Sequence, residues 1–320
     1  MISTRLTDRF GLDHPVVSAP MARAGGGRLA AAVTAGGGLG LIGGGYCDRD
    51  WIRAELDAAG NAAVGMGFIT WKLDQAPGLL EEVLERRPRA VFLSFGDPVP
   101  HAAAIAGAGV PLFAQVQSVE DARRAVAAGA AVIVAQGTEA GGHGAKRATL
   151  TLVPEVADYL AAAAPDTILL AAGGIADGRG LAAALMLGAE GVLCGTRFWA
   201  TAESLVPEAQ KRAALEADGD ATLRGSVIDV ARGIDWPARF DLRTMRNPFI
   251  DRWQGDLPGL AGNAAEKAAF ARAADAGDID TAPAIVGEGI GVIRDLPGAA
   301  EIPARLVAEA EALLTGGWRR

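Results

Sequence analysis

Residues 168–197 read ILLAAGGIADGRGLAAALMLGAEGVLCGTR. This stretch holds two short apolar runs, 168–171 and 191–194, on either side of an alanine-rich amphipathic segment at 178–187. Each run is too short for a helix and is followed by glycine, so it predicts a buried strand, and the segment between the runs predicts a helix. A strand, a crossing helix and a second strand are the unit from which parallel sheets are built.

The same unit recurs from the start of the chain, and six earlier apolar runs alternate with helical patterns. Eight such strands predict an α/β fold, the TIM (β/α)₈ barrel, because eight is the number that closes a barrel of this kind. An open doubly wound sheet is the second possibility, which is disfavoured because no G-x-G-x-x-G turn follows the first strand. The six earlier runs are residues 16–19, 39–42, 63–68, 90–93, 112–116 and 131–135.

The chain has 320 residues, which is more than the roughly 250 of a typical barrel. We assign residues 1–204 to the barrel. Residues 205–295 carry helix-like stretches without clear strand alternation, so we expect an additional helical element after strand eight, placed as a lid or second element. Residues 296–320 include an amphipathic segment, 303–314, which predicts a C-terminal helix packed back on the barrel.

Composition excludes several classes of protein. The formal net charge is −8 and no basic block is present, so we expect no nucleic-acid partner. Cys47 and Cys194 match no metal-binding spacing, so we expect no metal, and Cys194 lies in an apolar run typical of a core. No apolar run is long enough to cross a membrane and the first residues lack the apolar segment of a signal peptide, so we expect a cytoplasmic protein without membrane contact.

The glycines after the last two strands predict a phosphate site. Gly173 and Gly174 follow the seventh strand, and Gly195 and Thr196 follow the eighth. In this fold the active site lies at the carboxyl ends of the strands, and the loops after strands seven and eight usually hold a phosphate. Glycine lets backbone N–H groups approach the anion and Thr196 adds a hydroxyl donor. The alternative is that both segments are only tight turns.

The loop after the sixth strand, 136–144, ends in Gly-Gly-His-Gly and is the main catalytic candidate. A histidine in such a loop has no evident packing role, and imidazole can take or give a proton near neutral pH. We therefore predict that His143 is catalytic; the alternatives are a surface histidine or one that only hydrogen-bonds a cofactor. His14 and His101 fit the surface interpretation better. Glu139 either accepts from a nearby N–H or faces solvent.

Two further groups of residues are candidates for the cofactor. Ala19, Pro20 and Met21 follow the first strand, where small residues would let a flat ring lie against backbone, although Met21 could equally be a core residue. Gln115 and Gln136 could hydrogen-bond the edge of a heterocycle.

Aromatic residues after the third and fourth strands could line an apolar substrate pocket. These are Phe68, Trp71 and Phe95, with Ser94 beside them. Aromatic side chains at strand ends belong to a core more often than to a pocket, so both interpretations stay open.

Taken together, these stretches resemble the nitronate monooxygenases, formerly called 2-nitropropane dioxygenases, over essentially the whole chain. The loop at 136–143, QGTEAGGH, is the most specific part of the resemblance. The chain departs from many relatives in carrying Gly67 where they have asparagine, and in reading FLSFG at 92–96. The other matching stretches are 19–21, 38–45, 172–179, 195–198 and 287–291.

The resemblance implies FMN bound without a covalent link at the top of the barrel. It implies that His143 is the catalytic residue and that residues 19–21 line the flavin ring. The residues implied to contact the phosphate are Gly173, Gly174, Gly195 and Thr196, and those implied to contact the flavin are Gln136, Gly141 and Gly142.

The activity implied is FMN-dependent oxidation of alkyl nitronates or nitroalkanes by O₂, giving a carbonyl compound and nitrite. The partners would then be a small-molecule substrate and O₂. Two alternatives remain open: an NAD(P)H-dependent FMN reductase of quinones or enoyl thioesters on the same fold, and a barrel that binds FMN or a phosphorylated ligand without catalysis.

Overall fold

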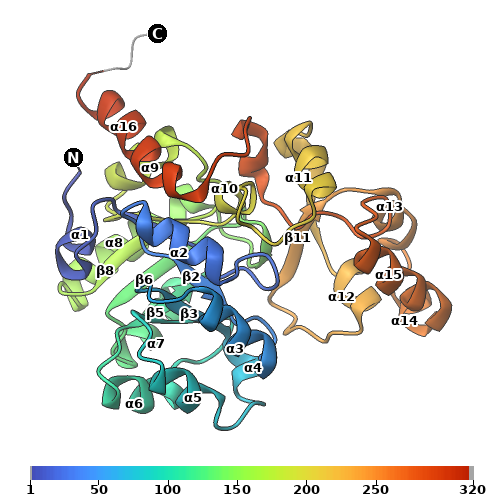
Figure 1. Cartoon of the computed structure of the whole chain (residues 1–320), viewed down its shortest axis with the longest axis horizontal. Coiled ribbons are helices and arrows are strands. Elements are labelled where there is room, and N and C mark those ends of the chain that lie inside the picture. The colour runs from blue at the N-terminus through green and yellow to red at the C-terminus, as the bar shows by residue number, and fades with distance from the viewer. Residues whose placement is uncertain (1, 317–320) are drawn as a thin grey trace.

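The computed structural model describes residues 2–316 and confirms the (β/α)₈ barrel (Figure 1). Its eight parallel strands lie in the order β1-β9-β8-β6-β5-β4-β3-β2. Leu39 joins the two edge strands, since its N–H donates to Val16 O and its C=O accepts from Ser18 N, both at 3.0 Å. The strands are β1 Val16–Ser18, β2 Leu41–Gly43, β3 Gly65–Ile69, β4 Val91–Ser94, β5 Leu112–Val116, β6 Val132–Gln136, β8 Ile168–Ala172 and β9 Val192–Cys194.

Helices surround the strands as the sequence predicts. Asp48 and Ser118 cap two of them, accepting from the N–H groups of Trp51 at 3.2 Å and Asp121 at 3.1 Å. The barrel helices are α2 Gly27–Ala35, α3 Arg49–Ala58, α4 Thr70–Leu73, α5 Leu79–Glu85, α6 Val99–Gly107, α7 Val119–Ala127, α8 Thr149–Ala163, α9 Gly178–Met186 and α10 Thr196–Trp199.

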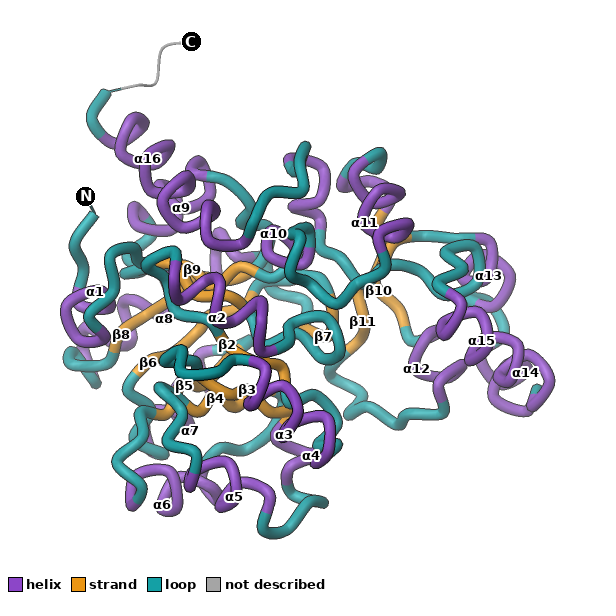
Figure 2. The backbone as a smooth tube through the Cα atoms, in the orientation of Figure 1, coloured by secondary structure: helices purple, strands orange, loops and turns teal. Residues whose placement is uncertain are grey.

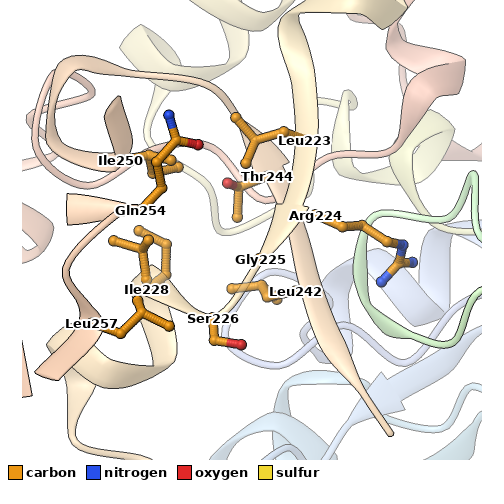
Figure 3. A pocket seen from close by; sticks show the side chains of 11 residues that line it. Leu223, Arg224, Gly225, Ser226, Ile228, Leu242, Thr244, Ile250, Gln254 and Leu257 are labelled. Atoms are coloured by element: carbon orange, nitrogen blue, oxygen red, sulfur yellow. The ribbon is translucent and has the colours of Figure 1, made fainter. Parts of the chain in front are cut away.

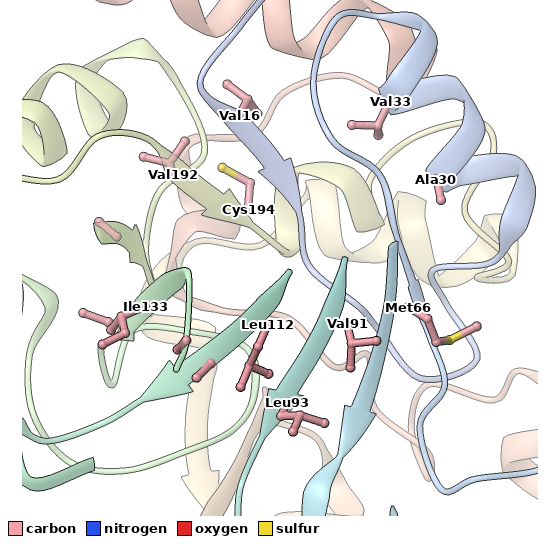
Figure 4. Packing of buried hydrophobic residues seen from close by; sticks show 14 of the residues in the cluster. Val16, Ala30, Val33, Met66, Val91, Leu93, Leu112, Ile133, Val192 and Cys194 are labelled. Atoms are coloured by element: carbon pink, nitrogen blue, oxygen red, sulfur yellow. The ribbon is translucent and has the colours of Figure 1, made fainter. Parts of the chain in front are cut away.

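The period-two alternation of the strands separates two apolar layers. Phe92 points into the barrel, where it packs with Phe113, whereas Val91 and Leu93 belong to the layer between strands and helices (Figure 4). The first helix, α1 Arg5–Phe10, adds Leu6 and Phe10 to the inner cluster at the amino end of the strands. The amino end is therefore filled with side chains, which leaves the carboxyl end for a ligand. Cys194 is buried in the outer layer, as predicted.

The C-terminal helix α16, Ile302–Leu314, packs along α9 of the barrel (Figure 1). Glu309 accepts from the N–H of Gly178, the first residue of α9, at 2.8 Å. A side chain at Gly178 would overlap Glu309, so this glycine permits the close approach of the two helices.

Residues after the barrel form a smaller unit at one side, hereafter the small domain (Figures 1 and 2). It is mostly helical, but it also contains two strands that the sequence did not predict, β10 Thr222–Gly225 and β11 Asp241–Met245. These strands form an antiparallel sheet with β7 Gly142–Gly144, in the order β10-β11-β7. Its elements are α11 Glu208–Leu215, η1 Gly219–Ala221, β10 Thr222–Gly225, α12 Val227–Arg232, β11 Asp241–Met245, α13 Pro248–Trp253, α14 Leu257–Gly262, α15 Ala264–Ala276 and η2 Glu288–Val292. The short helix η3 Ala299–Glu301, which follows them, packs on α2 of the barrel.

The sequence did not predict the small sheet because its strands lack the usual alternation of apolar and polar residues. Arg224 and Arg243 face each other across β10 and β11, at positions where apolar residues are common, and β7 consists of Gly-His-Gly. The other face of the sheet packs on α12, α13 and α14 around a cavity of about 250 Å³. Figure 3 shows Arg224 pointing away from the other labelled side chains of this cavity.

None of the helices in the described part of the chain is both long and apolar enough to cross a membrane. Within residues 2–316 no cluster of side chains suited to a metal ion occurs either.

Candidate active site

His143 lies in β7, within the segment that follows β6, and pairs with Leu242 of β11. Part of the glycine-rich segment expected to be a loop is therefore a short strand of the small sheet. Two arginines hold this segment by its carbonyl groups: Arg224 donates to Thr138 O at 2.9 Å and to Ala140 O at 3.0 Å, and Arg243 donates to Thr138 O at 3.1 Å. Small-domain residues thus fix the backbone that carries His143.

Asp229, on α12, is the hydrogen-bond partner of His143. Nε2 of His143 lies 2.9 Å from Oδ2 of Asp229, and both side chains are buried. In the neutral imidazole, Nε2 then carries the proton that the carboxylate accepts, and Nδ1 keeps its lone pair. Nδ1 makes no hydrogen bond within residues 2–316, so it is the atom of this ring that can take a proton.

Burial holds the pKa of His143 below its ordinary value of 6.5. The hydrogen bond and charge of Asp229 act in the opposite direction, while the positive charges of Arg232 and Arg224 lower the pKa further. The neutral form of His143 therefore predominates near neutral pH, which favours proton acceptance over a permanent positive charge at this position.

Four aromatic side chains form a cluster on one side of His143, which we call the aromatic cage: Trp236 and Phe95 contact the imidazole, and Trp71 and Phe240 pack against these two rings. The indole of Trp236 stacks on the imidazole with ring centroids 3.4 Å apart and planes 11° from parallel. Phe95 makes edge contacts with Trp236 and Phe240, both at 5.2 Å, and Trp71 contacts Trp236 at 5.3 Å. The cage therefore combines residues after β3 and β4 with residues of the small domain.

Phe95 adopts a φ of +62°, which a residue with a side chain rarely does. Such a conformation costs on the order of 1–3 kcal/mol and persists only where the surroundings enforce it. Here it places the phenyl ring 6.3 Å from the ring of His143.

The predicted pocket residues Phe68 and Ser94 are buried and are not part of the aromatic cage. Phe68 is fully buried in the apolar layer, and Ser94 donates its hydroxyl to Phe68 O at 3.1 Å. Trp71 and Phe95 reach the cage, whereas contact of Phe68 and Ser94 with a substrate stays a prediction. Sequence reasoning missed Asp229, Trp236 and Phe240.

Gln136 connects the strand ends to His143. Its side-chain oxygen accepts from Gln115 at 3.1 Å and from Gln117 at 2.9 Å, and its amide donates to His143 O at 3.2 Å. The predicted pair Gln115 and Gln136 is thus brought together, with Gln117 as a third member that the sequence analysis left out. The alternation of glutamines along the β5 end could have pointed to it, because Gln115 and Gln117 share one face.

Of the two predicted phosphate loops, the one that follows β9 lies beside the residues after β1. Gly173 and Gly174 have φ angles of +109° and +71°, which glycine adopts easily. A Cβ at Gly195 would lie 3.7 Å from Ala19 Cβ and 3.9 Å from Met21 Sδ. The residues predicted for the phosphate and for the flavin ring therefore adjoin one another.

The tail motif at 287–291 also reaches this edge of the barrel. Gly287 donates its N–H to Thr196 Oγ1 at 2.9 Å, and a side chain at Gly141 would overlap the backbone of Gly287. Glu139 accepts from the backbone N–H of Thr149 at 3.1 Å and from its hydroxyl at 2.7 Å. Glu139 is therefore the acceptor for a nearby N–H, one of the two roles considered for it.

Pro20 gives a structural reason for the glycine at position 67. A Cβ on Gly67 would overlap the ring of Pro20, so the proline occupies the space that a larger residue at position 67 would need. Gly67 lies within β3, beside Phe92 of β4.

A sequence model of the nitronate monooxygenase family matches residues 69–309. The chain belongs to this family. The nitronate monooxygenase of Neurospora crassa is 34% identical to it over 92% of this chain and 89% of its own length. As a member of the nitronate monooxygenase family, the chain is an oxidoreductase.

Two solved structures are similar to this chain over nearly its whole length. FabK from Thermotoga maritima superposes with a TM-score of 0.84 and 29% identity, covering 98% of both chains. A nitroalkane oxidase from Streptomyces ansochromogenes gives a TM-score of 0.78 and 28% identity, covering 97% of this chain and 99% of the other.

Proposed function

We propose that the chain binds FMN and oxidises alkyl nitronates or nitroalkanes with O₂, giving a carbonyl compound and nitrite. The proposal rests on the environment of His143. Its imidazole is buried and neutral, Asp229 holds it by a hydrogen bond to Nε2, Nδ1 is free, and the aromatic cage packs against the ring. The α carbon of a nitroalkane is acidic, and a neutral base in an apolar site suits the removal of its proton.

The residues at the strand ends fit FMN. Gly173 and Gly174 form a turn with left-handed backbone, and Gly195 has no side chain between its backbone and the neighbouring Ala19 and Met21. Such turns bring N–H groups to a phosphate, and small residues allow a flat ring to lie against backbone. Gly173, Gly174, Gly195 and Thr196 would hold the phosphate, with Gln136, Gly141, Gly142 and residues 19–21 beside the flavin.

Bound FMN would supply the electron-accepting chemistry that side chains lack. This chain's own residues would position the substrate and move its proton. With a nitroalkane, Nδ1 of His143 accepts the α proton, and the Asp229 carboxylate stabilises the imidazolium that forms. With a nitronate that proton is already absent, and His143 would bind the nitro oxygens through Nδ1–H when its imidazole is protonated.

The test is anaerobic mixing of the FMN-loaded protein with propyl-2-nitronate and, separately, with NADH and NADPH. The proposal expects loss of oxidised-flavin absorbance with the nitronate and none with either nicotinamide. Rapid bleaching by a nicotinamide without a response to nitronate would assign the chain to the reductase alternative. Bound FMN without response to any of the three would contradict the proposal and favour the non-catalytic alternative. Failure to bind added FMN would contradict the proposed cofactor itself.

A further inference from the structure

The segment 233–240, which we call the strap, connects α12 to β11 across the carboxyl ends of the barrel strands. Two contacts fasten it to opposite parts of the barrel. Trp236 donates its indole N–H to the hydroxyl of Tyr46, after β2, at 3.2 Å. Arg239 donates two hydrogen bonds to Asp121, at the start of α7, at 2.9 and 2.5 Å. The strap is thus held to the barrel at Trp236 itself and at Arg239.

Trp236 is the residue of the strap that closes the site. One face of its indole covers the imidazole of His143, and its edges meet Phe95 and Trp71. Because the ring is rigid and held at its nitrogen by Tyr46, it cannot withdraw from the cage without breaking the contacts of the strap. The side of the site next to the His143 imidazole is therefore formed by a side chain from the small domain.

Trp71 provides a second, independent observation. Its indole nitrogen is buried and has no hydrogen-bond acceptor within residues 2–316. A buried donor without a partner costs about 1–3 kcal/mol, a cost that an oxygen atom of a ligand would remove. A small molecule with an oxygen acceptor and a short apolar part could accept a hydrogen bond from Trp71 and pack against the aromatic rings of the cage.

We infer that Trp236 determines which substrates are accepted, by limiting the alkyl group of the nitronate or nitroalkane to a few carbon atoms. This inference rests on the proposed function and assigns its specificity to one residue. A pocket distinguishes substrates by about tenfold or more for each methylene group that does not fit. Trp236→Ala leaves only a methyl group in place of the whole side chain, which removes the steric barrier to a longer alkyl chain.

The test compares the FMN-loaded wild type with Trp236→Ala, Trp236→Leu and Trp236→Phe. Trp253→Phe is the matched control, because it alters an indole of the small domain that contacts Glu266 outside the cage. Two readouts are used: kcat/KM for ethyl and hexyl nitronates, and the Kd of propanoate and hexanoate, unreactive carboxylates with the planar shape and charge of a nitronate. Circular dichroism establishes that each variant is folded, and Trp236→Leu replaces Trp236→Ala should the latter unfold.

We expect Trp236→Ala and Trp236→Leu to shift both ratios toward the longer chain by about tenfold or more, while Trp236→Phe and Trp253→Phe change them less than about threefold. Unchanged ratios in folded Trp236→Ala and Trp236→Leu would overturn the inference. A shifted carboxylate ratio without nitrite release from any variant would support the role of Trp236 and contradict only the proposed reaction. Absence of both binding and turnover in every protein, wild type included, would overturn both.

Discussion

Nε2 of His143 and Oδ2 of Asp229 lie 2.9 Å apart, although the two residues are 86 positions apart in the sequence. The histidine follows a barrel strand and the aspartate belongs to the small domain. The site is therefore complete only when the small domain is docked on the barrel, and Asp229 selects which nitrogen of His143 is free to act as a base.

Asp229→Asn tests this positioning role. The amide carries no charge to stabilise the imidazolium, so we expect kcat for a nitroalkane to fall by about 10²-fold or more, with FMN still bound. Because Asp229 raises the pKa of His143, its removal should also move the acidic limb of the pH–rate profile to lower pH. Steady-state kinetics across pH measures both effects.

Asp256→Asn is the control for that substitution. Asp256 caps α14 in the same domain, accepting from the N–H of Gly259 at 2.9 Å, and makes no contact with His143. Its replacement should alter stability slightly and leave the pH–rate profile in place. A profile that moved equally in both variants would show that Asp229 acts only through the fold.

The pH dependence follows from the lowered pKa of His143. The neutral imidazole is the active form, so kcat/KM for a nitroalkane should stay constant through pH 6.5 and fall only below the shifted pKa. Stability changes in the same direction: the unfolded chain takes up the proton first as the pH falls, so the free energy of unfolding decreases between about 6.5 and the lower folded pKa. An NMR titration of His143 showing a pKa above 6.5 would contradict this.

The sequence predicted the barrel because short apolar runs alternate with amphipathic helical stretches, and such local patterns need no knowledge of distant residues. It also put Gly173, Gly174, Gly195 and residues 19–21 at the same edge of the barrel, since all follow strands of one parallel sheet. It could not find Asp229 or Trp236, because their roles depend on how the small domain docks. A tryptophan followed by proline between a helix and a strand is a visible signal, but nothing local to it indicates that it stacks on His143.

Gly173→Ala tests the predicted phosphate turn. Gly173 has a φ of +109°, and a Cβ there would lie 2.7 Å from Thr149 Oγ1 and 3.0 Å from Gly137 O. We expect a loss of about 1–3 kcal/mol in stability and weaker FMN binding, measured by thermal unfolding and by titration with FMN. Gly107→Ala is the control, since a Cβ there has open space and helical backbone; it should leave FMN affinity unchanged. Equal FMN affinity in both variants would remove Gly173 from the phosphate site.

Arg239→Ala tests whether the strap holds the cage closed. Burial raises the pKa of Asp121, but hydrogen bonds from Arg239 and Ser118 outweigh it, so the pKa lies below its ordinary value and the pair is ionic at neutral pH. An exposed pair of this kind contributes only about 0.2–1 kcal/mol to global stability. We therefore expect nearly unchanged unfolding but more rapid quenching of tryptophan fluorescence by acrylamide. Arg212→Ala, which breaks an exposed pair with Glu208 on α11, should leave the quenching unaltered.

Nitrite release by the FMN-loaded protein, measured with nitroethane and with ethyl nitronate in wild type and His143→Asn, tests the central claim most directly. The wild type should consume O₂ and release nitrite from both compounds. His143→Asn should keep FMN and lose about 10²–10⁴-fold in kcat/KM with nitroethane, with a smaller loss for the nitronate, whose proton is already absent. Undiminished nitroethane oxidation in His143→Asn, or no nitrite from the wild type with either compound, would contradict the account.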